Sequence, residues 1–326
     1  MINGKIVGTG AYLPEKVLSN KDLEQMVDTD DHWIVSRTGI RERRIAADSE
    51  ASSDLAMYAS REALKNAGVA PGDLDLIIVA TTTPDFPFPS TASVLQGKIG
   101  AKNAAAFDIQ AVCTGFVYAL AAANQFIRGG MYRTVLVVGA EVLSRVVDWE
   151  DRTTCILFGD GAGAVVLSAE AGTGGIISSH LNSDGTQYDS LFIPGGGSRE
   201  PLSSDVLNKR FHYIKMKGNE VFKLAVKALE ETAVEALEAN GITSGDIDLL
   251  VPHQANLRII NAMAKRFGFP SEKVVITVDR QGNTSAASIP LALHGAVNEG
   301  RLKDGDMVLL AAFGGGFTWG STLIRW

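Results

Sequence analysis

The chain has 326 residues, of which 46% are hydrophobic, and it carries a formal net charge of −7. This length suits one large domain or two of ordinary size, and the acidic balance argues against bulk attraction to nucleic acid. Two cysteines cannot build a disulfide framework, and no two histidines have metal-ligand spacing, so we expect no metal site.

The N-terminal residues lack the apolar run of a signal peptide. Polar and charged residues interrupt every apolar stretch that approaches the length of a membrane span. We therefore expect a cytoplasmic protein that does not enter a membrane.

The first half of the chain alternates helix and strand patterns. An amphipathic helix pattern ends at Asn66-Ala67-Gly68, and the run 72–79 that follows is typical of a strand buried on both faces. Three prolines make 84–90 a loop. A further apolar run at 104–109 predicts a strand, and after a short turn the stretch 115–127 predicts an apolar helix.

The second half of the chain repeats this order of elements. Three segments of the first half resemble segments of the second: the strand 72–79 resembles 245–251, the helix start 113–115 resembles 283–285, and the strand 133–139 resembles 305–311. Strand–helix patterns are common enough to coincide, but three landmarks in one order favour a duplication. If the halves pack with pseudo-two-fold symmetry, Cys113 and Asn283 are expected to meet near the axis.

Alternating strands and helices predict an α/β fold with mainly parallel or mixed sheets and helices packed on them. The glycine-rich stretch 171–175 suggests a boundary between an N-terminal half, 1–172, and a C-terminal half, 173–326. Residues 182–213 lack sustained periodicity, so we expect a long excursion along the surface or along a substrate site.

Cys113 is the most informative residue, because it stands between a predicted strand and the start of an apolar helix. The helix dipole and unpaired backbone N–H groups at such a position favour a thiolate, which is the reactive form of cysteine. We therefore expect a nucleophile. The alternative is a small buried hydrophobic residue, since free cysteine is among the most buried residue types.

Two further residues are candidates for chemistry. His253 follows the predicted strand 247–251 and Pro252, at a strand end where functional groups of α/β sheets collect. Its alternative is a structural, hydrogen-bonded histidine. Asn283 begins a predicted helix, where asparagine is usually only an N-cap, but its place in the repeat links it to Cys113.

Backbone groups and surface charge give two weaker signals. The three glycines 314–316 allow close backbone approach, so their N–H groups are placed to form an oxyanion hole; the alternative is a tight turn between two strands. Arg258, Lys265 and Arg266 share similar faces of a helix that begins near Asn256. They predict either a docking patch for phosphate or an acidic protein, or ordinary solvated charge.

Several long motifs together resemble the β-ketoacyl-acyl-carrier-protein synthase III family, the initiating condensing enzymes of type II fatty acid synthesis. The resemblance covers essentially the whole chain and rests on Gly8-Thr9-Gly10-Ala11-Tyr12-Leu13-Pro14, on Cys113, and on the segments 251–258, 282–288 and 313–320. It implies the thiolase fold, with two similar halves in a layered αβαβα core, and usually a homodimer. The implied substrates are an acyl-CoA and malonyl-acyl-carrier protein, with no cofactor.

The resemblance also implies roles for individual residues. Cys113 would hold the acyl group, and His253 and Asn283 would hydrogen-bond the malonyl thioester oxygen during decarboxylation. Backbone N–H groups of Cys113 and Gly315 would form the second oxyanion hole. The positions that match the CoA site and its pantetheine channel are Trp33, Arg37, Arg152, Gly218, Phe222, Ala255 and Asn256. Phe88 matches a residue that reaches the neighbouring subunit's acyl pocket, and Arg258, Lys265 and Arg266 fit the carrier-docking surface.

Other functions are weighed against this one. Elongating synthases use Cys-His-His, and 3-hydroxy-3-methylglutaryl-CoA synthases use a glutamate motif that is not found here. Plant-type polyketide synthases and enzymes of secondary metabolism share Cys-His-Asn, so they stay open. A Rossmann oxidoreductase needs a G-x-G-x-x-G motif, and Gly8-Thr9-Gly10 fails at the third glycine. A carrier-binding protein without catalysis leaves the Cys, His and Asn set unexplained. The primer depends on loops 84–90 and 189–210 and is not predicted.

Overall fold

The strands of the N-terminal half form a five-stranded sheet in the computed structural model, which describes residues 2–326. The strand order is β1-β7-β6-β4-β5, with β4 parallel to β5 and β6, and β7 antiparallel to β6 and β1. The strands are β1 Ile2–Tyr12, β4 Leu76–Ala80, β5 Ala105–Ile109, β6 Thr134–Glu141 and β7 Gly161–Ala171. All of β4 is buried, as the apolar run predicts for a strand covered on both faces.

A second sheet of four strands comes from the C-terminal half, in the order β11-β12-β13-β8. Its strands are β8 Gly175–Ser183, β11 Leu249–Pro252, β12 Met307–Gly314 and β13 Thr318–Arg325. β11 and β12 are parallel, and Pro252 pairs with Ala311. The predicted strand therefore runs one residue further than expected, because the next backbone N–H, from His253, still donates to the Ala311 carbonyl.

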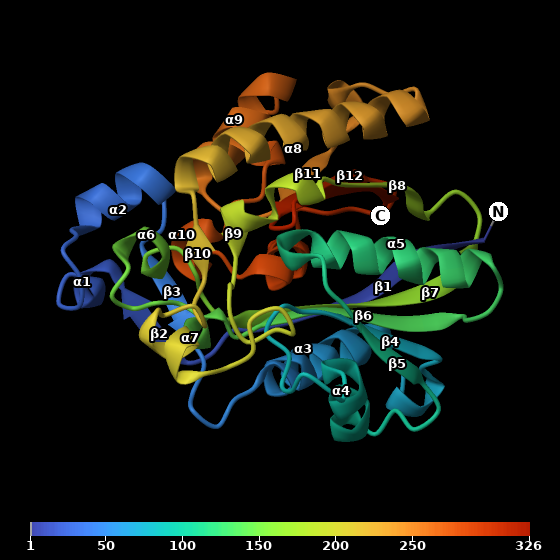
Figure 1. Cartoon of the computed structure of the whole chain (residues 1–326). Helices are drawn as coiled ribbons and strands as arrows, with labels where there is room; N and C mark the ends of the chain where they lie inside the picture. The colour runs from blue at the N-terminus through green and yellow to red at the C-terminus, as the bar shows by residue number, and fades with distance from the viewer. Residues whose placement is uncertain (1) are drawn as a thin grey trace.

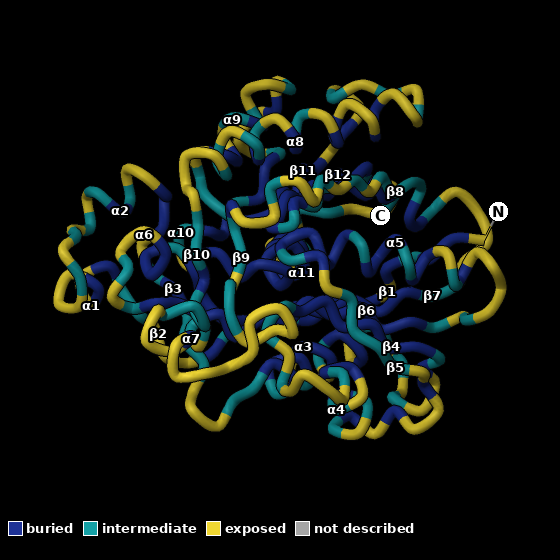
Figure 2. The backbone as a smooth tube through the Cα atoms, in the orientation of Figure 1, coloured by how far each residue is buried: buried dark blue, intermediate teal, exposed yellow. Residues whose placement is uncertain are grey.

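Helices lie between the two sheets and on both outer faces, so the chain forms five layers (Figure 1). Two helices lie in the middle layer, α5 Gly115–Arg128 and α11 Ser288–Asn298 (Figure 2). The N-terminal sheet is covered on the outside by α3 Ser52–Ala67 and α4 Thr91–Ile99. The C-terminal sheet is covered by α8 Gly218–Asn240 and α9 Leu257–Phe267.

Composition explains which helices take the middle layer. Helices that are apolar all round belong inside a protein, and α11 has eight buried residues among its eleven. One hydrophobic cluster joins Leu120 of α5 and Leu293 of α11 to strands of both sheets. In contrast, α9 buries Ile259, Ile260 and Met263 on one side and carries basic residues on the other. Such an amphipathic helix covers an outer face.

The internal repeat is regular in the structure. Corresponding elements start at 71 and 244 (η1 Pro71–Asp73, η5 Ser244–Asp246), at 76 and 249 (β4, β11), at 112 and 285 (η2 Val112–Thr114, η7 Ser285–Ala287), at 115 and 288 (α5, α11), and at 134 and 307 (β6, β12). The interval is 173 residues each time. The duplication is therefore confirmed, but the match of Cys113 with Asn283 is wrong by three residues, because Val112 corresponds to Ser285.

Shorter elements surround one end of this core. Two small sheets pair β2 Lys16–Ser19 with β3 Glu42–Ile45, and β9 Leu191–Phe192 with β10 Lys215–Met216. The short helices are α1 Asn20–Leu23, α2 Asp31–Thr38, α6 Arg152–Cys155, α7 Ser204–Asn208 and α10 Val278–Gln281. The remaining 3₁₀ turns are η3 Leu143–Arg145, η4 Gly185–Ser190 and η6 Ser271–Lys273.

The predicted α/β class is confirmed, and residues 84–90 form no helix or strand, as their prolines predict. Within residues 2–326, the helices are all too short or too polar to span a bilayer.

Candidate active site

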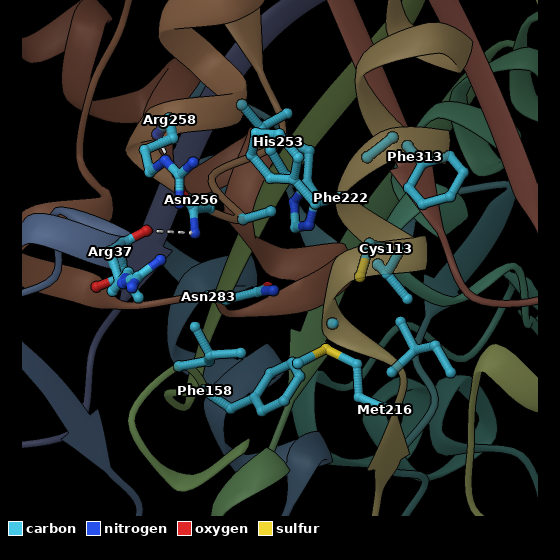
Figure 3. Close-up of a pocket in the computed structure, with 18 of the residues that line it drawn as sticks. Arg37, Cys113, Phe158, Met216, Phe222, His253, Asn256, Arg258, Asn283 and Phe313 are labelled. Carbon is cyan, nitrogen blue, oxygen red and sulfur yellow. Dashed lines mark hydrogen bonds between the residues drawn. The ribbon is translucent and has the colours of Figure 1, made fainter. Parts of the chain in front are cut away.

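A cavity of about 480 Å³ brings Cys113, His253 and Asn283 together. Cys113 lies on η2, His253 directly follows β11, and Asn283 directly precedes Thr284 and η7. The three side chains face one end of the cavity, with the Asn283 amide turned toward Cys113 (Figure 3). The expected meeting of the two halves therefore occurs, although through residues that are not symmetry equivalents.

Cys113 is held between a sheet and a helix. It stands on the 3₁₀ turn that leads into α5, and the residue is only 4% exposed. Gly314 lies against it: a Cβ at residue 314 would come within 2.7 Å of the Cys113 backbone nitrogen. Only glycine permits this approach of β12 to the candidate nucleophile.

The thiol of Cys113 does not have the low pKa that its helix position predicts. Its pKa is raised to about 12, chiefly by burial; the Ser285 hydroxyl opposes this rise and the Glu141 carboxyl adds to it. The expectation of a favoured thiolate is therefore wrong, because burial disfavours the charged form of the thiol. A thiol in this setting needs an acceptor for its proton before it can attack.

His253 is a neutral imidazole with a defined partner. Its Nδ1 lies 2.6 Å from Ser288 Oγ, and burial lowers its pKa to about 3. Ser288 Oγ already accepts from the Gln254 backbone N–H at 3.3 Å, so its own proton is free to go to Nδ1. This pattern favours the tautomer that carries its proton on Nε2. The ring can then donate a hydrogen bond into the cavity.

Asn283 combines the two roles that the sequence left open. Its Oδ1 accepts from the Ser285 N–H at 2.9 Å, which is the capping contact expected of asparagine at this position. Its backbone N–H donates to the Leu157 carbonyl at 2.8 Å. The side-chain orientation is thereby fixed, and the Nδ2 group is left as the donor on the cavity side.

Aromatic and basic side chains surround the other end of the cavity. Trp33, Arg37, Phe222 and Arg258 line it, and the guanidinium of Arg258 stands over the Phe222 ring at 5.0 Å. Asn256 Nδ2 donates to the Arg37 carbonyl at 3.1 Å and so joins α2 to the start of α9 (Figure 3). Charged groups at this opening suit an anionic ligand.

Other predicted residues take different places. Gly218 and Ala255 line the same cavity. Arg152 does not line it but stacks on Trp33, with its guanidinium 5.2 Å from the ring centre. Gly315 is also absent from the lining, where the adjoining Gly314 is found.

Three predicted residues lie apart from the cavity. Phe88 is 86% exposed on the loop before α4. Lys265 and Arg266 are exposed in the last turn of α9, and Arg266 Nε pairs with Glu230 Oε1 at 2.6 Å.

Sequence reasoning missed much of the cavity wall and the polar groups behind the site. Its unpredicted apolar lining includes Leu157, Phe158, Leu191, Met216 and Phe313. Phe313 comes from β12, whereas the other four come from short segments that carry no periodic signal. Ser288 and Glu141 were also missed; a serine within an apolar helix and a glutamate ending an apolar strand are the signals that point to them.

Comparison with known proteins gives one consistent result. Residues 107–185 match the family model of 3-oxoacyl-[acyl-carrier-protein] synthase III, and residues 237–326 match the model of its C-terminal part. The β-ketoacyl-[acyl-carrier-protein] synthase III of Caldanaerobacter subterraneus subsp. tengcongensis is 56% identical over 321 residues, 98% of this chain and 97% of the relative. That of Xanthomonas campestris pv. campestris strain ATCC 33913 is 57% identical over 325 residues, 100% and 99% of the two chains.

A solved structure agrees with the sequence relatives. The crystal structure of 3-oxoacyl-[acyl-carrier-protein] synthase III from Aquifex aeolicus VF5 matches with a TM-score of 0.93 at 49% identity, over 99% of this chain and 100% of that chain. Two repeated halves in five layers thus define a condensing enzyme of the thiolase fold. Within this class, the chain belongs to the β-ketoacyl-acyl-carrier-protein synthase III family. It is an acyltransferase that starts fatty acid synthesis by condensing an acyl primer with malonyl-acyl-carrier protein.

Proposed function

We propose that Cys113 carries the acyl primer, which it takes from an acyl-CoA. The observation that carries this proposal is the convergence of Cys113, His253 and Asn283 at one end of a cavity whose other end is basic. The sulfur attacks the thioester carbonyl, the carbon–sulfur bond to CoA breaks, and CoA leaves as its thiolate. Backbone N–H groups of Cys113 and Gly315 hold the oxyanion of this step.

His253 and Asn283 act in the second half of the reaction. As the malonyl group loses CO₂, negative charge moves onto its thioester oxygen, and two fixed donors stabilise that enolate. A neutral His253 with its proton on Nε2 and the Asn283 amide are donors of this kind. The enolate carbon then attacks the acyl-Cys113 carbonyl and regenerates the thiol form of the enzyme after protonation.

Separating the two half-reactions tests this division of labour. Asn283→Ala and His253→Ala should still form acyl-Cys113 from labelled acyl-CoA, but each should release CO₂ from malonyl-carrier protein about 10²–10³-fold more slowly. His253→Ala also shows whether the imidazole assists acylation. Blocked acylation with normal CO₂ release in Asn283→Ala would contradict the assignment.

The CoA portion of the primer is proposed to occupy the basic end of the cavity. Trp33 with Arg37 on one side and Arg152 on the other bracket the adenine, a place supported by the stacking of Arg152 on Trp33. The pantetheine arm passes Gly218, Phe222, Ala255 and Asn256, all of which line the cavity. The thioesters carry the acyl groups and the loss of CO₂ drives the condensation, so no cofactor is proposed.

Arg258, Lys265 and Arg266 are proposed to dock the acidic carrier protein. Arg258 stands at the opening of the cavity, where a carrier must deliver its arm. Arg258→Glu should raise the KM for malonyl-carrier protein at least tenfold, and Lys265→Glu, which lies apart from the cavity, should raise this KM while leaving acylation by acyl-CoA within twofold. Lys303→Glu, an exposed lysine on another face, is the matched control. An unchanged KM in Arg258→Glu, with no effect of salt on it, would overturn the proposal.

A homodimer is proposed, in which Phe88 reaches the acyl pocket of the neighbouring subunit. The support is the exposure of two aromatic rings on one loop, Phe86 at 53% and Phe88 at 86%. Sedimentation should give twice the mass of the chain, and Phe88→Ala should change the preference among primers of different length. A monomer would contradict the proposal.

We also propose a cytoplasmic location, and two similar halves that meet near residue 172.

A further inference from the structure

A glutamate that the reaction has not used lies behind Cys113. Glu141 ends β6 and is fully buried. Its carboxyl accepts hydrogen bonds from three consecutive threonines, including Thr82 N–H at 3.0 Å and Thr83 Oγ1 at 2.6 Å. Thr81 Oγ1 adds a longer one at 3.3 Å. Within residues 2–326, Glu141 belongs to none of the ion pairs.

Ser285 stands between Glu141 and the thiol. It is 2% exposed, and its φ of 48° is unusual for a residue other than glycine. The turn η7 that it starts packs against both η2 and β6, and a Cβ at Gly139 of β6 would come within 2.2 Å of the Ala286 carbonyl oxygen. The Ser285 hydroxyl has no hydrogen-bond partner within residues 2–326, and two elements that η7 contacts, η2 and β6, carry Cys113 and Glu141. It is therefore free to donate to one and accept from the other.

The path continues beyond Glu141. Thr82 and Thr83, whose hydroxyls both bond the carboxyl, also line a second cavity of about 230 Å³. This cavity lies between the start of α3 and the segment around Val142, with Asp85 and Arg145 in its wall. Hydroxyl and carboxyl groups thus follow one another from the turn that carries Ser285 to this second cavity.

We propose that Ser285 and Glu141 form a proton relay that activates Cys113. The thiol proton passes to Ser285 Oγ as the Ser285 proton passes to the Glu141 carboxylate. The Cys113 sulfur then forms a bond to the acyl carbon, and the bond between that carbon and the CoA sulfur breaks. One proton then rests on Glu141, and CoA leaves as a thiolate. The Thr82 and Thr83 hydroxyls return the Glu141 proton to water in the second cavity. This relay rests on the proposed acylation of Cys113.

The alternative base in the site is weak. Burial lowers the pKa of His253 to about 3, whereas burial raises the pKa of Glu141 above its ordinary value and so makes it the stronger base. The groups that face Glu141 are Thr81, Thr82 and Thr83 after β4, Ser285 on η7 and Cys113 on η2. None of these groups carries a positive charge that would hold the Glu141 carboxylate permanently ionised. The carboxyl group can therefore both take up a proton and release it.

The pH dependence of acylation tests the relay. Single-turnover labelling of Cys113 from acetyl-CoA should level off toward alkaline pH in the wild type, once Glu141 is charged. In Glu141→Gln it should be about 10²-fold slower at pH 7 and rise tenfold per pH unit up to pH 9, because solvent must take the proton. Ser285→Ala should behave alike, and Ser285→Gly repeats the test without strain at positive φ.

Two further measurements separate a relay from a structural role. Release of CO₂ from malonyl-carrier protein on preformed acyl-Cys113 should stay within twofold of the wild type in all these variants, since this step moves no proton to or from the sulfur. Thr284→Ala, which removes a neighbouring buried hydroxyl, should keep the wild-type pH profile. An unchanged profile in Glu141→Gln and both Ser285 variants, or equal slowing of acylation and CO₂ release, would overturn the relay. Absence of label on wild-type Cys113 would instead contradict the proposed function.

Discussion

Two buried cysteines show how access, rather than acidity, separates a candidate nucleophile from a structural residue. Burial raises the pKa of Cys155 to about 11, close to the value of about 12 for Cys113. Cys155 is fully buried on α6 among apolar residues such as Leu23 and Ile34, whereas Cys113 lines the large cavity. The position of Cys113 at a helix start is visible in the sequence. Its burial depends on η7 and β12, which lie far away along the chain.

Ser288 decides which nitrogen of His253 carries the proton. Ser288→Ala removes the partner of Nδ1, so the Nε2–H tautomer loses its preference and the donor to the enolate is weakened. We expect CO₂ release from malonyl-carrier protein to fall about tenfold, the equivalent of one hydrogen bond of ordinary strength. Labelling of Cys113 should change less than twofold.

Ser60→Ala supplies the control for this change. Ser60 is also a fully buried helical serine, but its hydroxyl has no hydrogen-bond partner within residues 2–326. Equal effects of Ser288→Ala and Ser60→Ala on CO₂ release would show that packing, and not the tautomer, matters.

At the scale of elements, the repeat was readable because strands and glycine turns keep their pattern. The runs 72–79 and 245–251 align by their Gly-Asp starts, and both correspond to a 3₁₀ turn followed by a strand. The register near the site was not readable, since Asn283-Thr284 and Cys113-Thr114 look alike in sequence. Positive φ angles at Val112 and Ser285 mark the true correspondence, and backbone strain leaves no local signal in residues of this kind.

Close packing of η7 on β6 gives a prediction about Gly139. A Cβ there would lie 2.2 Å from the Ala286 carbonyl oxygen, so Gly139→Ala must displace the turn that carries Ser285. We expect a loss of about 1–3 kcal/mol in the free energy of unfolding, measured as a lower urea midpoint with an unchanged slope.

The matched substitution is Gly72→Ala in η1. A Cβ at residue 72 would meet nothing within 4 Å, and the residue is exposed. The prediction fails if both variants unfold at the same urea concentration.

At the scale of the whole molecule, the fold class and the three central residues of the site were within reach of the sequence. Apolar runs give the strands, and apolar helices give the middle layer. The cavity was not within reach, because its wall combines α2, α8, β12 and the short segments around Phe158 and Leu191. Packing of distant segments, rather than any local pattern, determines its shape.

Burial of a neutral histidine couples stability to pH. The pKa of His253 is 6.5 in its ordinary state and falls to about 3 in the folded protein, so the unfolded chain binds its proton first. The stability that His253 contributes is therefore complete above about pH 6.5 and is lost as the pH falls toward 3. The difference in unfolding free energy between the wild type and His253→Gln should shrink by about 1.4 kcal/mol per pH unit between pH 6 and 4.5.

Urea unfolding of both proteins at matched pH values measures this difference directly. His32→Gln is the control, because that histidine is exposed. A constant difference between the wild type and His253→Gln across the range would mean that His253 is protonated as easily in the folded protein as in the unfolded one.

The central claim, that Cys113 carries the acyl group, is tested most directly by peptide mass spectrometry after incubation with acetyl-CoA and other acyl-CoAs. The wild type should gain one acyl group on the peptide that contains Cys113 and none on the peptide that contains Cys155, which has no place in the cavity wall. Cys113→Ser should give no stable adduct and no condensation, because a hydroxyl is a far weaker acid than a thiol. An acyl group on Cys155 alone, or condensation that persists in Cys113→Ser, would contradict the account.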